Sequence, residues 1–259
     1  MKHIHVVGSG PRTGTTLMVE AMIACFRIDQ HTDHEDRVFV APPGPGEIYL
    51  SKAPKDLLVI KSFLDLDPDL YVICMIRDPR DMIVSKHGLA PDRYWVGLSY
   101  WNTYIASWRR NRGHPRFFTV RYEDFVSDPD AAQVELMALM PFLEKTATFS
   151  RYHEIATPSE RSLLALGILR EIGPDGIGAW RNHLPRIAGQ VRIHGSITED
   201  LIEFGYEEDE GWAAVLDGVE PDLSSSHLPE RLSKLNLLRR TAPAYWPIMK
   251  AKLKRSVRY

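Results

Sequence analysis

The chain has 259 residues, of which 44% are hydrophobic and 25% are charged. These proportions indicate a globular protein with one large core, and the formal net charge of -2 gives no overall attraction to nucleic acid. The only cysteines, Cys25 and Cys74, lie in apolar stretches, which favours buried thiols over a disulfide framework. We recognise no signal peptide and no apolar run of the roughly 18 residues that a membrane span needs. We therefore predict a cytoplasmic protein.

The predicted strands and helices alternate along the chain. Such alternation is typical of an α/β fold, in which helices cover a parallel sheet. The Val/Ile-rich run LYVICMI is short and wholly apolar, as expected for a strand that is buried on both faces. We predict strands at 3–8, 48–52, 70–76 and 117–122, helices at 15–26, 55–64 and 130–143, a polar loop at 29–47, and mainly helical chain from 158 onward.

A glycine-rich segment, GSGPRTGTT, joins the first predicted strand to the first helix. Its glycines let backbone N–H groups approach an anion closely, and the helix N-terminus adds partial positive charge. An ATP-binding loop has a lysine directly after its last glycine, but Thr15 stands there in this chain. Arg12 supplies the positive charge instead, with the hydroxyl groups of Thr13 and Thr16 beside it. The segment predicts an anion site without the ATP pattern; the alternative is a glycine-rich turn with no ligand.

A second cluster follows the buried strand 70–76. Arg77 comes at its carboxyl end, and we place Ser85 about a turn and a half into the next helix. Because ligands of open α/β sheets bind beyond the carboxyl ends of strands, Arg77 and the glycine loop should face one crevice. Two separate cationic clusters predict two phosphate groups. The alternative is a surface ion pair between Arg77 and Asp78, an aspartate that resembles the metal-binding acid of ATP-binding proteins.

Together these motifs resemble the sulfotransferase family that uses 3′-phosphoadenosine 5′-phosphosulfate (PAPS). GPRTGTTL resembles its 5′-phosphosulfate loop, and RDPRDMIVS resembles its 3′-phosphate segment. RYEDF at 121–125 resembles its Tyr-Glu-Asp segment, and IGAWRNHL at 177–184 resembles its late Trp-Lys/Arg-Asn motif. The resemblance covers 6–184 and lies nearer the carbohydrate and tyrosylprotein branches than the cytosolic small-phenol branch. It implies a P-loop NTPase-like sulfotransferase fold, with a parallel sheet flanked by helices and a mainly helical C-terminal part.

The resemblance implies PAPS as donor and 3′-phosphoadenosine 5′-phosphate (PAP) as product, with no metal. Arg12 would stabilise the transferring sulfonate, because catalysis in the analogous phosphoryl transfer rests on positioning and charge stabilisation. Arg77 and Ser85 would hold the 3′-phosphate. Tyr122 would contact adenine, and the alternative is a buried tyrosine in a strand. The predicted donor-binding residues are Pro11, Arg12, Thr13, Gly14, Thr15, Thr16, Arg77, Ser85, Tyr122, Trp180 and Arg181, with Arg170 as a further candidate.

Two more residues complete the predicted catalytic set with Arg12. Lys52 resembles a lysine that reaches the bridging leaving oxygen in the carbohydrate and tyrosylprotein branches; the alternative is a solvent-exposed lysine. The histidine that cytosolic members carry after the second strand is missing here. HEDRVF resembles the Glu-Glu-Thr-Arg segment of the tyrosylprotein branch, so we predict Glu35 as general base, with Asp36 or His34 as substitutes and a solvated loop carboxylate as the alternative.

The acceptor is predicted only by class, as a hydroxyl of a carbohydrate or glycolipid. An aromatic stretch could line an acceptor groove or pack in the core. Two other functions remain open: a P-loop kinase, which should carry the missing lysine, and a non-catalytic nucleotide-binding protein of the same fold. The aromatic residues of that stretch are Trp95, Tyr100, Trp101, Tyr104 and Trp108.

The last thirty residues differ from the rest. Residues 230–259 carry nine Lys or Arg against Glu230 alone, a net charge of +8. They predict a solvated basic tail, and the alternative is docking on a membrane surface or an acidic partner. We therefore divide the chain into a sulfotransferase domain at 1–215 and a helical, basic extension at 216–259, and predict no oligomeric state.

Overall fold

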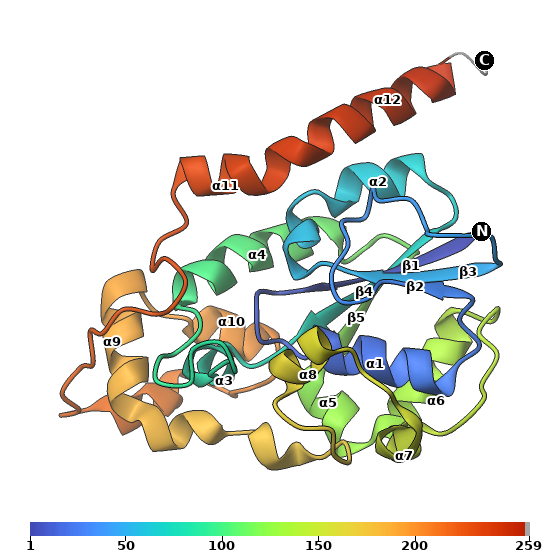
Figure 1. Cartoon of the computed structure of the whole chain (residues 1–259). Helices are drawn as coiled ribbons and strands as arrows, with labels where there is room; N and C mark the ends of the chain where they lie inside the picture. Colours follow the sequence, from blue (N-terminus) through green and yellow to red (C-terminus); the bar gives the residue numbers. More distant parts are fainter. Residues whose placement is uncertain (257–259) are drawn as a thin grey trace.

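The computed structural model describes residues 1–256, with no side chains described for 254–256. Its centre is a five-stranded sheet in the order β2-β3-β1-β4-β5, and every neighbouring pair of strands is parallel (Figure 1). Helices flank this sheet, which confirms the predicted α/β fold. The strands are β1 (Lys2–Gly8), β2 (Gln30–His31), β3 (Ile48–Lys52), β4 (Leu70–Ile76) and β5 (Phe117–Arg121).

Helices cover both faces of the sheet because successive strand residues point to opposite sides. Val6 and Ile73 belong to a core cluster with residues of α1, α5 and α6, whereas Val7 and Cys74 belong to a second cluster with residues of α2 and α4. The helices are α1 (Thr15–Cys25), α2 (Ile60–Leu66), α3 (Pro79–Val84), α4 (Leu98–Asn111), α5 (Tyr122–Ser127), α6 (Pro129–Leu139), α7 (Tyr152–Ile155), α8 (Glu160–Leu166), α9 (Leu184–His194), α10 (Thr198–Glu203), α11 (Lys234–Thr241) and α12 (Tyr245–Ser256).

Short 3₁₀ helices join these elements. One of them, η1, replaces the first half of the helix that we predicted at 55–64, and Val59 separates it from α2. The helix predicted at 130–143 ends at Leu139, before Pro141, because the residue preceding a proline is disfavoured in helical conformation. The 3₁₀ helices are η1 (Pro54–Leu58), η2 (Phe149–Arg151), η3 (Pro174–Gly176), η4 (Ala179–His183), η5 (Glu210–Leu216) and η6 (Ala242–Ala244).

Two predicted positions near the site are wrong. Ser85 is not inside a helix, because α3 ends at Val84 and Ser85 is extended, with φ -71° and ψ 138°. Tyr122 is not in a strand, because β5 ends at Arg121 and Tyr122 is the first residue of α5. The structure also adds β2 inside the polar segment that we predicted to be a loop.

The C-terminal helices α11 and α12 cross one side of the molecule (Figure 1). α12 lies against α2, and Ala244 and Ile248 pack on the core cluster there. In the predicted basic tail, the side chains of Lys254 and Arg255 and the whole of Arg258 lie outside the described residues. The division of the chain at residue 215 stays a prediction.

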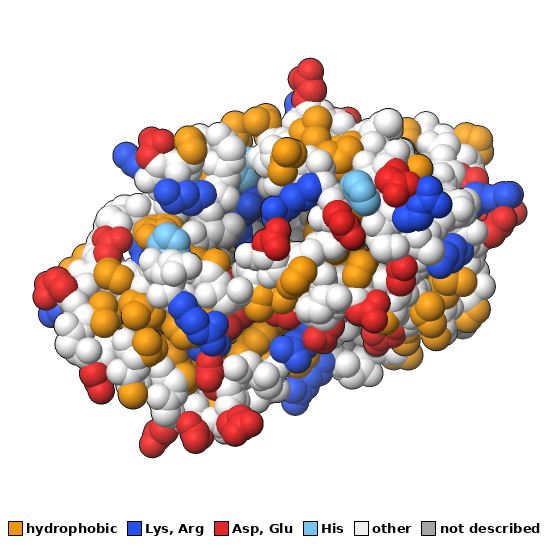
Figure 2. Space-filling model, turned by 90° about the horizontal axis from the view of Figure 1, so that it is seen from below, with side chains coloured by type: hydrophobic (Ala, Val, Ile, Leu, Met, Phe, Trp, Pro, Cys, Tyr) orange, Lys and Arg blue, Asp and Glu red, His pale blue; other side chains and the backbone are white. Residues whose placement is uncertain are grey.

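Surface charge and helix length bear on whether the described residues could bind nucleic acid or cross a membrane. Figure 2 shows acidic and basic side chains interspersed over one face, without the extended positive surface that binds a nucleic-acid backbone there. Among residues 1–256, no helix is long and apolar enough to cross a bilayer. Cys25 and Cys74 are both free and buried, as predicted.

Candidate functional site

The glycine loop turns sharply between β1 and α1. Gly14 precedes α1 in left-handed conformation, with φ 85°, and a Cβ atom there would lie 2.5 Å from the Tyr122 ring. Glycine is therefore required at this position both for its backbone conformation and for the close approach of the ring. Within residues 1–256, Arg12 is the one non-glycine residue with positive φ, at 67°. Such backbone strain is frequent at ligand-binding sites.

Arg12 connects the glycine loop to two other parts of the chain. Its Nε donates a hydrogen bond to Ser85 Oγ at 3.0 Å, and its Nη1 donates to the Ala165 carbonyl at 2.9 Å. Burial, followed by the positive charge of Arg77, lowers the pKa of Arg12 to about 10. Arg12 remains charged at neutral pH, but it lies where an anionic partner would stabilise it.

Arg77 lies at the carboxyl end of β4, beside the glycine loop, as the sequence predicts. It donates from Nη1 to the Arg12 carbonyl at 3.2 Å and from Nη2 to the Gly176 carbonyl at 2.9 Å. Its guanidinium carbon lies 4.3 Å from the centre of the Tyr122 ring. Its Nε is buried and has no hydrogen-bond partner among the described residues. An unpaired buried donor is costly, so this atom favours a ligand that accepts a hydrogen bond.

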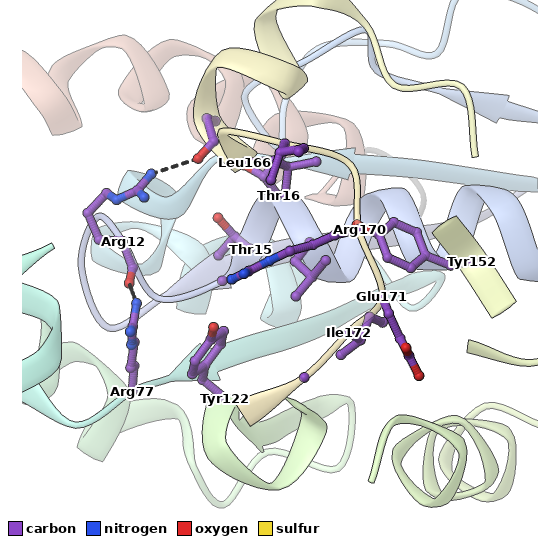
Figure 3. A pocket seen from close by; sticks show the side chains of 15 residues that line it. Arg12, Thr15, Thr16, Arg77, Tyr122, Tyr152, Leu166, Arg170, Glu171 and Ile172 are labelled. Atoms are coloured by element: carbon purple, nitrogen blue, oxygen red, sulfur yellow. Dashed lines mark hydrogen bonds between the residues drawn. The ribbon is translucent and has the colours of Figure 1, made fainter. Parts of the chain in front are cut away.

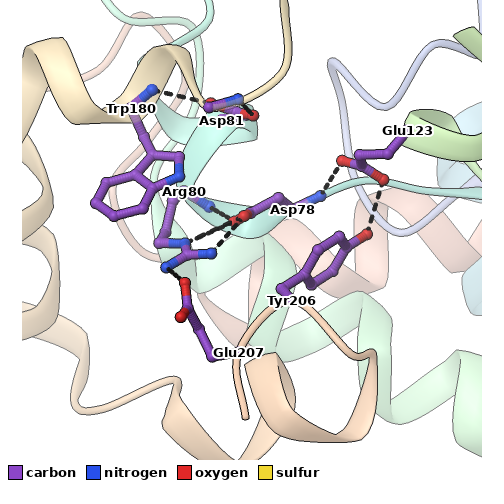
Figure 4. A network of polar contacts seen from close by, with 8 residues as sticks. Asp78, Arg80, Asp81, Glu123, Trp180, Tyr206 and Glu207 are labelled. Atoms are coloured by element: carbon purple, nitrogen blue, oxygen red, sulfur yellow. Dashed lines mark hydrogen bonds and ion pairs between the residues drawn. The ribbon is translucent and has the colours of Figure 1, made fainter. Parts of the chain in front are cut away.

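The alternative ion pair between Arg77 and Asp78 does not form. Asp78 instead accepts hydrogen bonds from Arg80 Nη2 at 2.7 Å and from the Arg80 backbone N–H at 2.8 Å (Figure 4). Glu123 accepts from the Asp78 backbone N–H and from the Tyr206 hydroxyl. These buried contacts fix the chain directly after Arg77, while the Arg77 side chain stays on the glycine-loop side.

Asp81 positions the late motif against α3. Its carboxylate accepts hydrogen bonds from the Gly178 N–H at 2.7 Å and the Trp180 N–H at 2.9 Å (Figure 4). Trp180 is buried under Arg80, whose guanidinium carbon lies 4.1 Å from the ring centre, whereas Arg181 is exposed. Neither Trp180 nor Arg181 lines the pocket beside the glycine loop.

That pocket, which we call the loop pocket, has a volume of about 140 Å³. Its wall opposite the loop comes from the chain between α7 and η3, and the Arg170 side chain extends from this wall across the pocket toward Thr15 (Figure 3). We did not predict Tyr152 and Leu166 as pocket residues, because both lie outside the recognised motifs in the sequence. Its lining residues include Arg12, Gly14, Thr15, Thr16, Arg77, Tyr122, Tyr152, Leu166 and Arg170.

Lys52 lies at the carboxyl end of β3 and is only 1% exposed. Its Nζ donates to Thr16 Oγ1 at 2.8 Å and lies 3.9 Å from Glu35 Oε1. Burial lowers the pKa of Lys52 to about 8, although the carboxylates of Glu35 and Glu20 oppose this shift. The alternative of a solvent-exposed lysine is therefore wrong, and Lys52 presents its ammonium group to the start of α1.

A second pocket, the outer pocket, lies on the other side of the glycine loop and has a volume of about 490 Å³. Arg12, Thr15, Thr16 and Ala165 line both pockets. Chemistry between two bound molecules would take place beside these shared residues. The outer pocket is also lined by Pro11, His34, Glu35, Pro54, His87, Leu89, Trp95, Arg161 and Leu164.

The outer pocket holds several groups that could accept a proton. Glu35 and His34 line it, but Asp36 does not. His34 Nδ1 lies 3.3 Å from Ser162 Oγ, and burial lowers its pKa to about 4. His87 was not predicted from the sequence as a residue of the site. Burial lowers the pKa of His87 as well.

Trp95 is the one residue of the predicted aromatic stretch that lines the outer pocket. The His87 ring stacks on the Trp95 ring with 4.3 Å between the ring centres. The His227 ring also stacks on Trp95, with 4.4 Å between the ring centres. The other four aromatic residues are buried in α4, so core packing is the correct interpretation for them. They are Tyr100, Trp101, Tyr104 and Trp108.

Two predicted loop residues differ in what their side chains reach. Thr13 is buried, and its hydroxyl donates to the Gly10 carbonyl at 3.1 Å, so it stabilises the loop itself. Pro11 lines the outer pocket rather than the loop pocket. Ser85 contacts Arg12, as described above, and lines neither pocket.

Part of the sequence matches a known family. Residues 20–140 match the model of the sulfotransferase family. This match includes Arg77, Ser85 and Tyr122 and begins after the glycine loop. It supports sulfuryl transfer as the general class of reaction, without distinguishing a branch of the sulfotransferases.

No curated protein matches the sequence. One similar solved structure is the sulfotransferase domain from the Synechococcus PCC 7002 olefin synthase, with 16% identity and a TM-score of 0.43. The similarity covers 70% of this chain and 87% of that domain.

Proposed function

We propose that the protein transfers the sulfuryl group of PAPS to the hydroxyl of an acceptor. The observation that carries this proposal is the meeting of Arg12 and Arg77 at the glycine loop. Within the described part of the chain, neither guanidinium forms an ion pair with a carboxylate, and the buried Nε of Arg77 has no partner. Two adjacent cations without a neutralising acid favour a ligand with more than one anionic group.

The residues present fit such a donor. The backbone N–H groups at the start of α1, with Arg12, would bind the 5′-phosphosulfate, and Arg77 would bind the 3′-phosphate. Tyr122, which packs on Gly14 and Arg77, would contact the adenine. The loop pocket is smaller than the roughly 300 Å³ at which typical ligand pockets begin, so we expect α8 to move outward when the donor binds.

The shared wall of the two pockets supports in-line transfer. The acceptor oxygen would form its bond to sulfur while the bond from sulfur to the 5′-phosphate oxygen breaks. Arg12 and Lys52 would stabilise the charge on the leaving oxygen, and Glu35 would take the hydroxyl proton. The hydrogen bond from Lys52 to Thr16 supports this role, although Lys52 comes from β3 rather than from the loop.

Of the two predicted acceptor classes, we favour a glycolipid. Leu89, Leu164 and Trp95 give the outer pocket an apolar wall. A bare sugar usually stacks on an open aromatic face, but His87 and His227 already stack on Trp95. An acceptor with an apolar chain next to its hydroxyl would bury more apolar surface against this wall.

The cytoplasmic location of the protein is also a proposal.

Thermal unfolding tests donor binding. PAP at 100 times its Kd should stabilise the folded protein by about 2.7 kcal/mol and so raise the midpoint temperature of unfolding. We expect ATP with magnesium to leave this midpoint unchanged. Stabilisation only by ATP with magnesium would instead establish the kinase alternative. Adenosine 5′-phosphate serves as the control, because it lacks the 3′-phosphate that Arg77 would bind.

A transfer assay then separates an enzyme from a non-catalytic binding protein. We expect label from PAPS to reach a glycolipid acceptor, with the same rate when a chelator removes divalent metal. Binding of PAP without transfer to any glycolipid or carbohydrate, together with indifference to Glu35 and Lys52 substitutions, would establish the non-catalytic alternative.

A further inference from the structure

A stripe of exposed apolar side chains runs along α11 and α12. Its most exposed members are Trp246 at 75% and Tyr245 at 61%. Single exposed apolar residues are ordinary on protein surfaces, but these follow one another along two consecutive helices. The stripe consists of Leu235, Leu238, Tyr245, Trp246 and Met249.

The helical positions separate the stripe from the face of α12 that packs on the protein. At about 100° per residue, Tyr245, Trp246 and Met249 fall within one arc of roughly 100°. Ile248, which packs on the core cluster, lies outside this arc. Lys250 and Lys252 fall at the two edges of the arc. A lysine on each edge can cover an apolar face with its stem while its ammonium group reaches outward.

A basic pocket lies where α11 meets η1. Its volume is about 330 Å³. Four of its lining residues are cationic and no carboxylate is among them; the lining residues are Arg37, Lys55, Tyr100, Pro229, Asn236, Arg239 and Arg240.

The cations of this basic pocket are not equally engaged. Arg37 forms an ion pair with the buried Asp56, and Arg240 donates to the hydroxyl groups of Tyr100 and Tyr104 at 3.3 Å. Lys55 and Arg239 have no ion-pair partner within residues 1–256. The basic pocket therefore has positive charge available for an anion.

We propose that α11 and α12 seat the protein on a membrane that contains anionic lipids. The apolar stripe would lie at the boundary of headgroups and acyl chains, and a lipid phosphate would enter the basic pocket. Tyr and Trp side chains are favoured at that depth, and each Lys or Arg near an anionic surface adds electrostatic attraction.

Charge complementarity favours a lipid surface over a second copy of this chain. Residues 231–259 contain no Asp or Glu. A two-fold contact through the stripe would bring two basic helices together, and their like charges would repel. An anionic membrane complements the same charges.

The membrane surface would also lie close to the outer pocket. Pro54 lines the outer pocket and its neighbour Lys55 lines the basic pocket; likewise Glu35 lines the outer pocket and Arg37 lines the basic pocket. Membrane binding goes beyond the proposed transfer, because it requires neither donor nor acceptor.

Vesicle flotation tests the proposal. We expect the full chain to bind vesicles of phosphatidylcholine with phosphatidylserine, to bind phosphatidylcholine alone weakly, and to lose binding in high salt. Trp246→Ser and the double variant Lys250→Glu with Lys252→Glu should each lower binding at least about tenfold. Val134→Ser, which changes a 62% exposed residue on α6, is the matched control and should bind normally.

Two further measurements identify the source of the anion and the occupant of the stripe. Lys55→Glu should weaken vesicle binding; if it instead removes only inorganic phosphate binding while vesicles bind normally, the basic pocket is not a lipid site. A dimer that Trp246→Ser converts to monomer, with no vesicle binding by the wild type, would overturn the proposal. Unchanged stabilisation of Trp246→Ser by PAP separates either failure from a failure of the proposed transfer.

Discussion

Lys52 donates a hydrogen bond from its Nζ to Thr16 Oγ1 at 2.8 Å, although 36 residues separate them. The parallel pairing of β1 with β3 makes this possible, because Val6 lies opposite Lys52 in the register. The carboxyl ends of the two strands therefore meet beside the glycine loop. A neighbouring strand thus brings a lysine to the start of α1, although the loop itself has a threonine where the ATP pattern has lysine.

Replacement of Arg12 should mainly affect the transfer step. We expect Arg12→Ala to lower kcat by about 10²–10³-fold, because a preorganised donor at the developing charge is lost. Steady-state kinetics with labelled PAPS would measure it. Arg27→Ala, in an exposed ion pair with Glu144, is the control. A normal kcat for Arg12→Ala would remove Arg12 from the catalytic set.

Replacement of Arg77 should mainly weaken donor binding. Hydrogen bonds to charged groups contribute about 1.5–3 kcal/mol, so Arg77→Ala should weaken PAP binding by about 10–150-fold and change adenosine 5′-phosphate binding little. Calorimetry would measure both. Arg181→Ala tests another of the predicted donor-binding residues, and its exposed position leads us to expect normal affinity. If Arg77→Ala keeps full affinity for PAP, the placement of the 3′-phosphate is wrong.

The lowered pKa of Lys52 predicts an alkaline limit to activity. Its ammonium group loses its proton as pH rises through about 8, so kcat/KM should fall there. In Lys52→Arg this fall should shift to much higher pH, because a guanidinium keeps its charge. The same fall in both proteins would assign it to another group.

The same shift gives a stability test with a defined sign. The unfolded chain keeps the Lys52 proton up to the ordinary pKa of 10.5, whereas the folded chain loses it near 8. Between these values the unfolded state binds more protons, so this group makes stability rise with pH. Urea unfolding of wild type and Lys52→Met should therefore differ in slope across this range, and parallel curves would contradict the buried, shifted lysine.

The general base can be assigned by comparing neighbours in one loop. We expect Glu35→Gln to lower kcat by about 10²–10⁴-fold, because proton removal is lost. Asp36→Asn should keep normal kcat, since Asp36 lies outside the outer pocket. If His34→Asn shows the large effect and Glu35→Gln does not, histidine is the base.

Patterns within single elements predicted much of the site. The buried strand at 70–76 has the same bounds in the structure. It brings Arg77 to the carboxyl end of the sheet, as expected. Apolar periodicity could not show that α3 ends at Val84, because no glycine or proline directly follows this residue to mark the end of the helix. Lys52 was predicted only through a resemblance; its burial depends on packing that no local pattern reports.

Long-range contacts account for what the sequence did not show. Arg12 reaches Ala165 across 153 positions of the chain, and the residues around Ala165 carry no motif that we recognised. His87 and His227 likewise both stack on Trp95. Such contacts arise when separate loops settle on the finished sheet, so they follow from tertiary packing rather than local propensity.

The position of α8 couples the two pockets. Ala165 belongs to both pockets, and Leu164 and Leu166 extend the wall into one pocket each. An outward movement of this one helix to admit a nucleotide therefore reshapes the neighbouring cavity as well. The two ligands should influence each other's affinity equally, as thermodynamic linkage requires.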